Sequence, residues 1–194
     1  MLINFITPMS RPENYNALLT SIKQATSDFY WIVVLDSVSV GDLFKSHNLE
    51  LPTVEKNIKL ISYPSLYRGI SGNPQRNHAL DFIREGYIYY LDDDNIVHPD
   101  LIKNTTKYIN ANQGVIVSQI TKEGNVRLVP RKDKIGVCQV DTAQFLFPTY
   151  MTEGVRWLPH DYCADGIYLS EIYHKNESNF VLLDDRLSYY NYLR

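Results

Sequence analysis

The chain has few cysteines and no excess of basic residues, and each shortage excludes a class of function. Its 194 residues contain two cysteines, Cys138 and Cys163, and no Cys-x-x-Cys pair. This pattern argues against a disulfide framework or a zinc site and favours buried thiols in a reducing compartment. Nineteen Lys and Arg against 22 Asp and Glu give a net charge of -3. Without a basic surplus to neutralise phosphates, nucleic acid is not an expected partner.

Long apolar runs are also missing. No run approaches the roughly 18 residues that a membrane-spanning helix needs, and no basic segment of a signal peptide follows Met1. We therefore expect no transmembrane segment and a cytoplasmic location, with peripheral attachment to a membrane as the open alternative. A chain of this length, with 44% hydrophobic and 21% charged residues, is typical of one soluble globular domain covering 1–194.

Runs of apolar, β-branched and aromatic residues of strand length recur along the chain. They lie at 2–6, 30–35, 58–61, 87–91, 115–120 and 180–183, with helical stripes at 18–25 and 79–83. The alternation predicts an α/β fold with a mostly parallel central sheet that helices cover on both faces.

Helix-start and helix-end signals sharpen part of this prediction. Asn73-Pro74 and a later Gly86 predict a helix over 74–85, and His98-Pro99 predicts one that runs to about 111. After residue 120 the pattern changes to short strands at 126–129 and 144–147 and a helix at 161–174. The second half is thus predicted to be an α+β portion on the same sheet.

Polar residues directly follow several of these strands. In open α/β sheets, ligands bind beyond the carboxyl ends of the strands, so these positions are candidates for a site. They are Thr7-Pro8, Asp36, the run Asp92-Asp93-Asp94-Asn95, and Asp141 near the later strands.

Three adjacent carboxylates at a strand end repel one another unless a cation neutralises them. Oxygen ligands of this kind suit Mg²⁺ or Mn²⁺, which keep open positions for a diphosphate. The alternative is an exposed acidic turn in which Asp94 or Asn95 caps the next helix.

Other candidates are weaker when taken alone. Asp36 can accept a hydrogen bond from a nucleobase or ribose, or form a simple Asx turn. Arg76 lies at a helix start that follows two glycines, where N–H groups favour phosphate, although many helix-start loops look alike.

Asp161 and Asp165, four residues apart on the predicted helix, form a paired carboxylate that can supply a general base. Two exposed acids at a helix start are the alternative. Trp157 offers an aromatic face for a sugar ring, and His160 and His174 are read as ordinary histidines.

Taken together, these motifs resemble the nucleotide-sugar glycosyltransferases of the GT-A fold, and their order is most similar to that of the β-1,3-glucuronosyltransferases. General similarity to the broad family 2 transferases is also visible. The motifs span about residues 3–170. They are Ile6-Thr7-Pro8 with Arg11-Pro12, Trp31-Ile32-Val33-Val34-Leu35-Asp36, Gln75-Arg76-Asn77-His78-Ala79-Leu80 and Asp92-Asp93-Asp94-Asn95.

The resemblance implies a Rossmann-like three-layer sandwich with a nucleotide-sugar-binding half, 1–120, and an acceptor and catalytic half, 121–194. It implies that Pro8, Arg11 and Asp36 surround the base and that Arg76 approaches the ribose or diphosphate. Asp92 and Asp93 would hold the nucleoside, with Asp94, and Asp92 beside it, as metal ligands. Asp141 would contact the acceptor together with Trp157, and Asp165 would be the catalytic base, with Asp161 as its neighbour.

Two departures from the glucuronosyltransferases weaken that closer similarity. Ser10 stands where they carry an aromatic residue, and their late histidine near the diphosphate has only Arg186 as a cationic substitute within 180–192. Glucuronic acid is therefore not assigned as the donor sugar.

The sequence predicts a metal-dependent, inverting glycosyltransferase that moves a sugar from a UDP-sugar to a hydroxyl of a saccharide or other acceptor. Two alternatives remain open at this point. One is a catalytically inactive nucleotide- or sugar-binding module. The other is a haloacid dehalogenase-like phosphatase, which Leu91-Asp92-Asp93-Asp94 superficially resembles.

Overall fold

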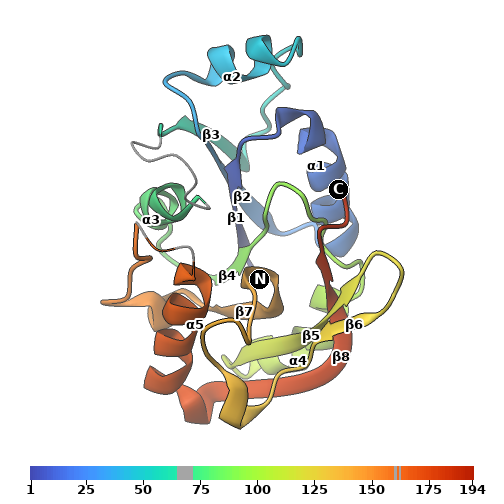
Figure 1. The fold of residues 1–194 in the computed structure, drawn as a ribbon, viewed down its shortest axis with the longest axis vertical. Helices are drawn as coiled ribbons and strands as arrows, with labels where there is room; N and C mark the ends of the chain where they lie inside the picture. The colour runs from blue at the N-terminus through green and yellow to red at the C-terminus, as the bar shows by residue number, and fades with distance from the viewer. Residues whose placement is uncertain (65–71, 160, 162) are drawn as a thin grey trace.

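The computed structural model describes residues 1–64, 72–159, 161 and 163–194. Within these residues, eight strands and five α-helices alternate through most of the length (Figure 1). In order they are β1 (Ile3–Met9), α1 (Tyr15–Ala25), β2 (Phe29–Leu35), α2 (Val40–Ser46), β3 (Ile58–Ser62), α3 (Asn73–Leu80), β4 (Tyr87–Tyr90), α4 (Leu101–Asn110), β5 (Gly114–Thr121), β6 (Val126–Leu128), β7 (Phe145–Pro148), α5 (Ala164–Lys175) and β8 (Phe180–Tyr190).

One sheet contains all eight strands, in the order β3-β2-β1-β4-β7-β5-β6, with β8 paired to β5. The pairs β1–β2, β2–β3, β1–β4 and β5–β8 are parallel, whereas β7 runs antiparallel to both β4 and β5. The predicted mixed α/β fold with a mostly parallel sheet is therefore confirmed. Within the described ranges, no helix combines the length and the apolar character needed to cross a membrane.

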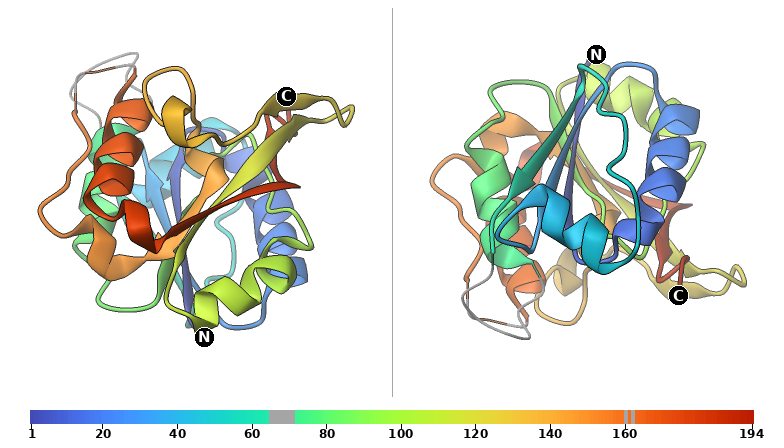
Figure 2. Two further views of the ribbon diagram at one scale, coloured as in Figure 1. Left: turned by 90° about the horizontal axis from the view of Figure 1, so that it is seen from below. Right: turned by 90° about the horizontal axis from the view of Figure 1, so that it is seen from above.

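Alternating side chains of the strands bury two apolar clusters, one on each face of the sheet. Phe5, Trp31 and Val33 pack with α1 and α4, whereas Ile6 and Ile32 pack with α3 and α5 on the other face. Figure 2 shows these two pairs of helices on opposite sides of the sheet. The three layers hold the strand ends at fixed positions.

The carboxyl end of β1 extends beyond its neighbour β4 and lies beside the site. β1 continues to Met9, beyond the predicted end at residue 6, and pairs with β4 only as far as Ile6 and Tyr90. Pro8 lacks an N–H donor but is tolerated in this central strand, because β4 has already ended beside it. The Asp92–Asp94 turn therefore emerges next to the last residues of β1.

Several predicted boundaries were wrong. The helix predicted at 74–85 ends at Leu80, because i→i+3 bonds such as that from Ile83 N to Leu80 O replace the α-helical pattern. The sequence analysis missed α2, which begins after Ser39, whose hydroxyl accepts from the Asp42 N–H. β8 runs seven residues beyond the predicted end at 183.

Candidate active site

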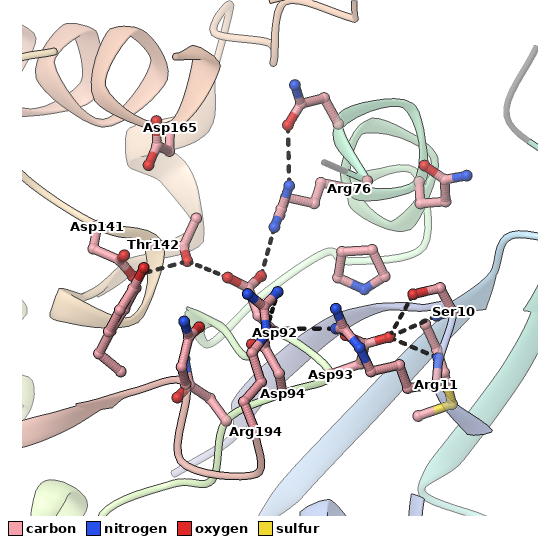
Figure 3. A pocket seen from close by; sticks show the side chains of 18 of the residues that line it. Ser10, Arg11, Arg76, Asp92, Asp93, Asp94, Asp141, Thr142, Asp165 and Arg194 are labelled. Carbon is pink, nitrogen blue, oxygen red and sulfur yellow. Dashed lines mark hydrogen bonds and ion pairs between the residues drawn. The ribbon is translucent and has the colours of Figure 1, made fainter. Parts of the chain in front are cut away.

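A cavity of about 570 Å³ opens at the carboxyl ends of β1, β2 and β4. Figure 3 shows its labelled side chains, which come from both halves of the chain and converge on Asp92. Most of the residues that the sequence singled out line it: Pro8, Arg11, Asp36, Arg76, Asp92, Asp93, Asp94, Asp141 and Asp165. Strand order thus brings together positions up to 157 residues apart in the sequence, from Pro8 to Asp165.

Asp93 fixes the turn that follows β1. Its Oδ2 accepts hydrogen bonds from the backbone N–H of Ser10 at 2.7 Å and of Arg11 at 2.8 Å, and from the Ser10 hydroxyl at 3.0 Å. Its Oδ1 accepts from Arg11 Nη1 at 2.5 Å. The protein engages both oxygens, so Asp93 orients Arg11. The expected contact of Asp93 with a nucleoside stays a prediction.

Asp92 lies at the centre of the cavity, between its two walls. Arg76 Nη2 donates to Asp92 Oδ1 at 2.5 Å, and the Thr142 hydroxyl donates to Asp92 Oδ2 at 2.9 Å. The Asp92 side chain is 29% exposed, compared with 8% for Asp94. Asp92 is thus positioned from both sides and still open to the cavity.

Asp94 is surrounded by arginine. Arg194 Nη2 lies 2.7 Å from Asp94 Oδ2, and Arg11 Nη1 lies 3.4 Å from the same atom. The backbone also holds this corner, because Leu193 N donates to Asp94 O at 2.9 Å. Burial raises the pKa of Asp94, and the charges of Asp92 and Asp93 raise it further, although both arginines oppose the shift.

The residues present fit a hard divalent cation. Asp92 and Asp94 present carboxylate oxygens, the hard ligands that Mg²⁺ and Mn²⁺ prefer, and Asp92 is open to the cavity. Among the described residues, no cluster of three or more His, Cys, Asp or Glu side chains is placed to hold a metal alone. Asp92 and Asp94 would therefore supply only some of the oxygen ligands, which leaves positions for a diphosphate.

Arg76 is held from α3, near the start of the helix. Gly72 precedes α3 with φ +74, and a Cβ there would lie 2.4 Å from Pro8 Cβ, so glycine permits the helix to approach β1. Arg76 Nη1 donates a hydrogen bond to Asn73 Oδ1 at 3.0 Å, and the guanidinium lies 4.7 Å above the Trp157 ring.

The structure contradicts the prediction that Trp157 contacts the acceptor. Only 1% of its surface is exposed, and it stacks on Tyr168 with ring centroids 4.3 Å apart. Arg76 lies over its ring. No face is left for a sugar, so the expected acceptor contact is wrong, and Trp157 instead supports Arg76 from below.

Asp165 and Asp161 do not share a helical face as predicted. α5 begins at Ala164, so Asp161 precedes it; Asp161 Oδ1 accepts from Cys163 N at 2.8 Å, an Asx turn leading into the helix. Asp165 lines the cavity, whereas Asp161 is absent from its lining. Burial raises the pKa of Asp165, the nearby Asp141 and Asp92 add to the shift, and the Gly166 N–H and Arg76 oppose it.

Asp141 is paired within the protein. It precedes a short 3₁₀ turn, Thr142–Gln144, and its side chain and that of Gln144 cap the turn reciprocally. Arg127 Nη1 lies 3.1 Å from Asp141 Oδ2, and the guanidinium lies 3.7 Å above the Tyr190 ring. Burial raises the pKa of Asp141, with Asp92 adding and Arg127 opposing.

We call the side of the cavity formed by Cys138, Asp141, Thr142, Cys163 and Asp165 the C-terminal wall. In Figure 3 Asp165 and Asp141 lie across the cavity from Arg11 and Asp93. Of the two histidines considered from the sequence, His174 is exposed on α5 and His160 lies outside the described residues. Gly69, the first of the two glycines before Arg76, also lies outside them.

Three lining residues that contact the predicted acids were not among the sequence candidates: Thr142, Arg127 and Arg194. Arg194 reaches the cavity because β8 continues to Tyr190, and its guanidinium lies beside Asp94. Arg186, the one cation noted within 180–192, is exposed on β8. The β-prone run Leu187-Ser188-Tyr189-Tyr190 was the signal for this extension. No sequence pattern indicates that Arg127 contacts Asp141 or that Thr142 contacts Asp92.

A family model described as Glycosyl transferase family 2 matches residues 12–174, most of the chain. The chain belongs to this family. This membership confirms the predicted GT-A fold and the resemblance to family 2 glycosyltransferases, and it makes the phosphatase alternative wrong. The closer similarity to glucuronosyltransferases is not confirmed and stays a prediction.

Solved structures share the fold at low sequence identity. The Staphylococcus aureus protein TarS, residues 1–349, superposes with a TM-score of 0.67 at 16% identity over 97% of this chain and 60% of that chain. TarS 1–349 in complex with UDP-GlcNAc gives 0.66 at 15%, over 97% and 58%. The mannosyltransferase PcManGT from Pyrobaculum calidifontis, in complex with GDP-Man and Mn²⁺, gives 0.63 at 12%, over 98% and 56%.

The chain therefore spans about 60% or less of the length of these neighbours. At such identities the similarity shows the fold alone. The search of curated proteins gave no match.

Proposed function

We propose that this domain catalyses metal-dependent, inverting transfer of a sugar from a UDP-sugar to a hydroxyl of a saccharide or other acceptor. The observation that carries the proposal is the convergence of Asp92, Asp94, Arg76 and Asp165 on one cavity. Family 2 membership supports the reaction class. The complexes of structural neighbours with UDP-GlcNAc, UDP and GDP-Man support a nucleotide-sugar donor.

Donor binding is assigned to the strand ends of the first half, 1–120. Pro8, Arg11 and Asp36 line the cavity beyond β1 and β2, where the nucleoside would lie. A carboxylate accepts the N3–H of uracil but faces an acceptor nitrogen in cytosine, so we assign UDP as the nucleotide and Asp36 as the group that reads it. Arg76, paired with Asp92, is placed for the ribose or diphosphate.

Asp94, together with Asp92, is assigned to hold Mn²⁺ or Mg²⁺. When bound, the ion supplies positive charge that stabilises the departing diphosphate. Arg11 and Arg194 already place two guanidinium groups beside Asp94, so this corner is built for negative charge on the donor. The hydrogen bonds between Arg11 and Asp93 fix the position of Arg11 at this corner.

The second half, 121–194, is assigned to the acceptor. Asp165, on the first turn of α5, would take the proton of the acceptor hydroxyl as that oxygen attacks the anomeric carbon. Its raised pKa makes the carboxylate a stronger base than a solvent-exposed Asp. Attack from the C-terminal wall, opposite the diphosphate corner, leads to inversion. Asp141 is assigned as an acceptor contact on that wall.

A donor panel tests the proposal. We expect UDP-sugars, incubated with the full chain and Mn²⁺, to release UDP, with hydrolysis to water in the absence of an acceptor. EDTA should stop the release, and Asp36→Ala should narrow the preference of wild type for UDP over CDP in calorimetry. Equal binding of CDP and UDP by wild type would show that Asp36 does not read the base.

The inactive-module alternative predicts a different result from the same panel. Such a module would bind UDP in calorimetry but release none from any donor, with or without acceptors. Release that depends on both metal and Asp165 is inconsistent with it.

A further inference from the structure

The two cysteines lie on the same wall of the cavity, although 25 positions separate them in sequence. Cys138 lies in the loop between β6 and β7, and Cys163 directly precedes α5. Cys138 is exposed and Cys163 is partly exposed, so the buried thiols expected from the sequence are not what the structure shows. Both sulfur atoms belong to side chains that a solute in the cavity can reach.

Backbone packing holds the two segments against each other. Gly166, on the first turn of α5, faces the loop so closely that a Cβ would lie 2.6 Å from Val137 Cα and 2.9 Å from Gly136 O. Val137 adjoins Cys138, and Gly166 lies one helical turn after Cys163. The loop and the helix start are therefore in direct contact next to both thiols.

The thiols also interact with each other. After burial, the charge and the side-chain hydrogen bond of Cys138 are the largest causes that raise the pKa of the Cys163 thiol, and Asp161 and Asp165 add to the effect. The raised pKa disfavours the thiolate of Cys163, and Cys138 is the more exposed residue of the two. This asymmetry suits a pair in which one sulfur reacts first and the other resolves the product.

We propose that Cys138 and Cys163 form a redox-active dithiol, which a peroxide or a low-molecular-weight disulfide closes to an intramolecular disulfide on the C-terminal wall. With hydrogen peroxide, the Cys138 thiolate attacks one oxygen to give a sulfenic acid and, with a proton, water. The Cys163 sulfur then displaces the second oxygen as water and forms the S–S bond. Two thiols and one peroxide thus give one disulfide and two waters.

The disulfide would tie the 136–138 loop to the start of α5, which carries Asp165 two residues after Cys163. Because Asp165 is the assigned base, closure is expected to lower transfer while donor binding on the opposite side persists. This consequence for activity rests on the proposed function, whereas formation of the disulfide does not.

Thiol chemistry on the full chain tests the bond directly. After exposure to peroxide or oxidised glutathione, we expect both thiols to be lost together and the monomer mass to fall by about 2 Da. A non-reducing peptide map should link Cys138 to Cys163, and dithiothreitol should reverse the change. Cys138→Ser and Cys163→Ser are matched controls, in which the remaining thiol can form only adducts or acids.

Three results would overturn the proposal: both thiols still titratable after oxidation, a disulfide that links two chains, or a Cys138 sulfinic acid beside a free Cys163. Calorimetry with UDP and Mn²⁺ on the reduced protein separates this test from the proposed function. If the reduced protein fails to bind UDP, the proposed function is wrong. The dithiol proposal is then judged by the protein mass and the peptide map alone. If oxidised protein binds UDP but transfers at least several-fold more slowly than reduced protein, both hold.

Discussion

Asp165 combines an assigned chemical role with an electrostatic cost. Its carboxyl is partly buried on the C-terminal wall near Asp141 and Asp92, which disfavours the charged form that a general base requires. Asp161, four residues earlier, is not among the residues that line the cavity, and its Oδ1 accepts the Cys163 N–H. The two acids therefore form a matched pair for mutation.

We expect Asp165→Asn to lower kcat by roughly 100-fold or more and to leave UDP affinity unchanged, because a base acts on the acceptor proton in the transition state. Asp161→Ala should keep kcat and lose about 1 kcal/mol of stability with its Asx-turn bond. Steady-state kinetics, calorimetry and urea unfolding on both variants decide the matter. Loss of transfer in Asp161→Ala with normal kcat in Asp165→Asn would reverse the assignment.

The raised pKa of Asp165 also predicts a pH dependence. The folded protein binds its proton more tightly than the unfolded chain does, so this group destabilises the fold as pH rises from 3.8, the ordinary Asp value, through the raised folded pKa. Asp165→Asn should therefore unfold at a higher urea concentration than wild type at pH 7, and this gain should vanish below pH 3.8. A variant that is less stable than wild type at pH 7 would contradict this sign.

Arg194 and a metal ion would compete for the same carboxylate. The guanidinium lies 2.7 Å from Asp94 Oδ2 and is 55% exposed, so the ion pair is moderate in strength. We expect Arg194→Ala to tighten binding of Mn²⁺ alone by roughly 3- to 10-fold, measured by calorimetry without nucleotide. Arg186→Ala, which changes the charge equally at an exposed position of β8, is the control. Unchanged or weaker Mn²⁺ binding in Arg194→Ala would show that the arginine does not occupy the cation position.

Among the elements, the start of α5 depends on one glycine. A methyl group on Gly166 would meet the backbone of Val137 and Gly136, which cannot move aside as a flexible side chain can. We expect Gly166→Ala to cost about 1–3 kcal/mol of unfolding free energy despite the better helix propensity of Ala, and to lower kcat by displacing Asp165. Gly136→Ala is the control, because a Cβ there would meet nothing within 4 Å. Equal stability of the two variants would show that the 136–138 loop moves aside to accommodate the added methyl group.

The sequence predicted the strand cores of this fold well because their apolar runs are continuous and bounded by turn residues. The ends of strands and helices were predicted less well. β1 continues through Thr7-Pro8 only because β4 ends beside Ile6, and α3 ends at Leu80 where the backbone tightens into i→i+3 bonds. Both limits depend on neighbouring segments and not on local sequence.

In the site, too, residues fixed by local sequence were predicted and residues fixed by distant contacts were not. Asp36, Asp92 and Asp94 were predicted because each directly follows a buried strand, and strand ends meet at one edge of a parallel sheet. Trp157 was misjudged because its type alone does not show whether its ring is covered by Tyr168 and Arg76. Arg194 was missed because its contact with Asp94 requires the full length of β8, whose register on β5 shifts twice.

In the whole molecule, helices cover both faces of the sheet (Figure 2), and the corner formed by Arg11, Asp94 and Arg194 shares one cavity with the C-terminal wall. The sheet joins the two walls through β7, which pairs with both β4 and β5. A donor bound beside Arg11 and Asp94 and an acceptor bound at the C-terminal wall would therefore meet over Asp92. Arg76 and Thr142 hold Asp92 from either side.

Calorimetric titration of the full chain with UDP, in Mn²⁺ and in EDTA, tests the assigned metal-dependent donor site most directly. Because the diphosphate would complete the ligands that Asp92 and Asp94 begin, we expect Mn²⁺ to tighten UDP binding by about 10-fold or more. Asp94→Ala should lose this gain, and Asp184→Ala, an equal charge change at an exposed position of β8, should keep it. Equal UDP affinity in Mn²⁺ and in EDTA would contradict the metal-dependent site.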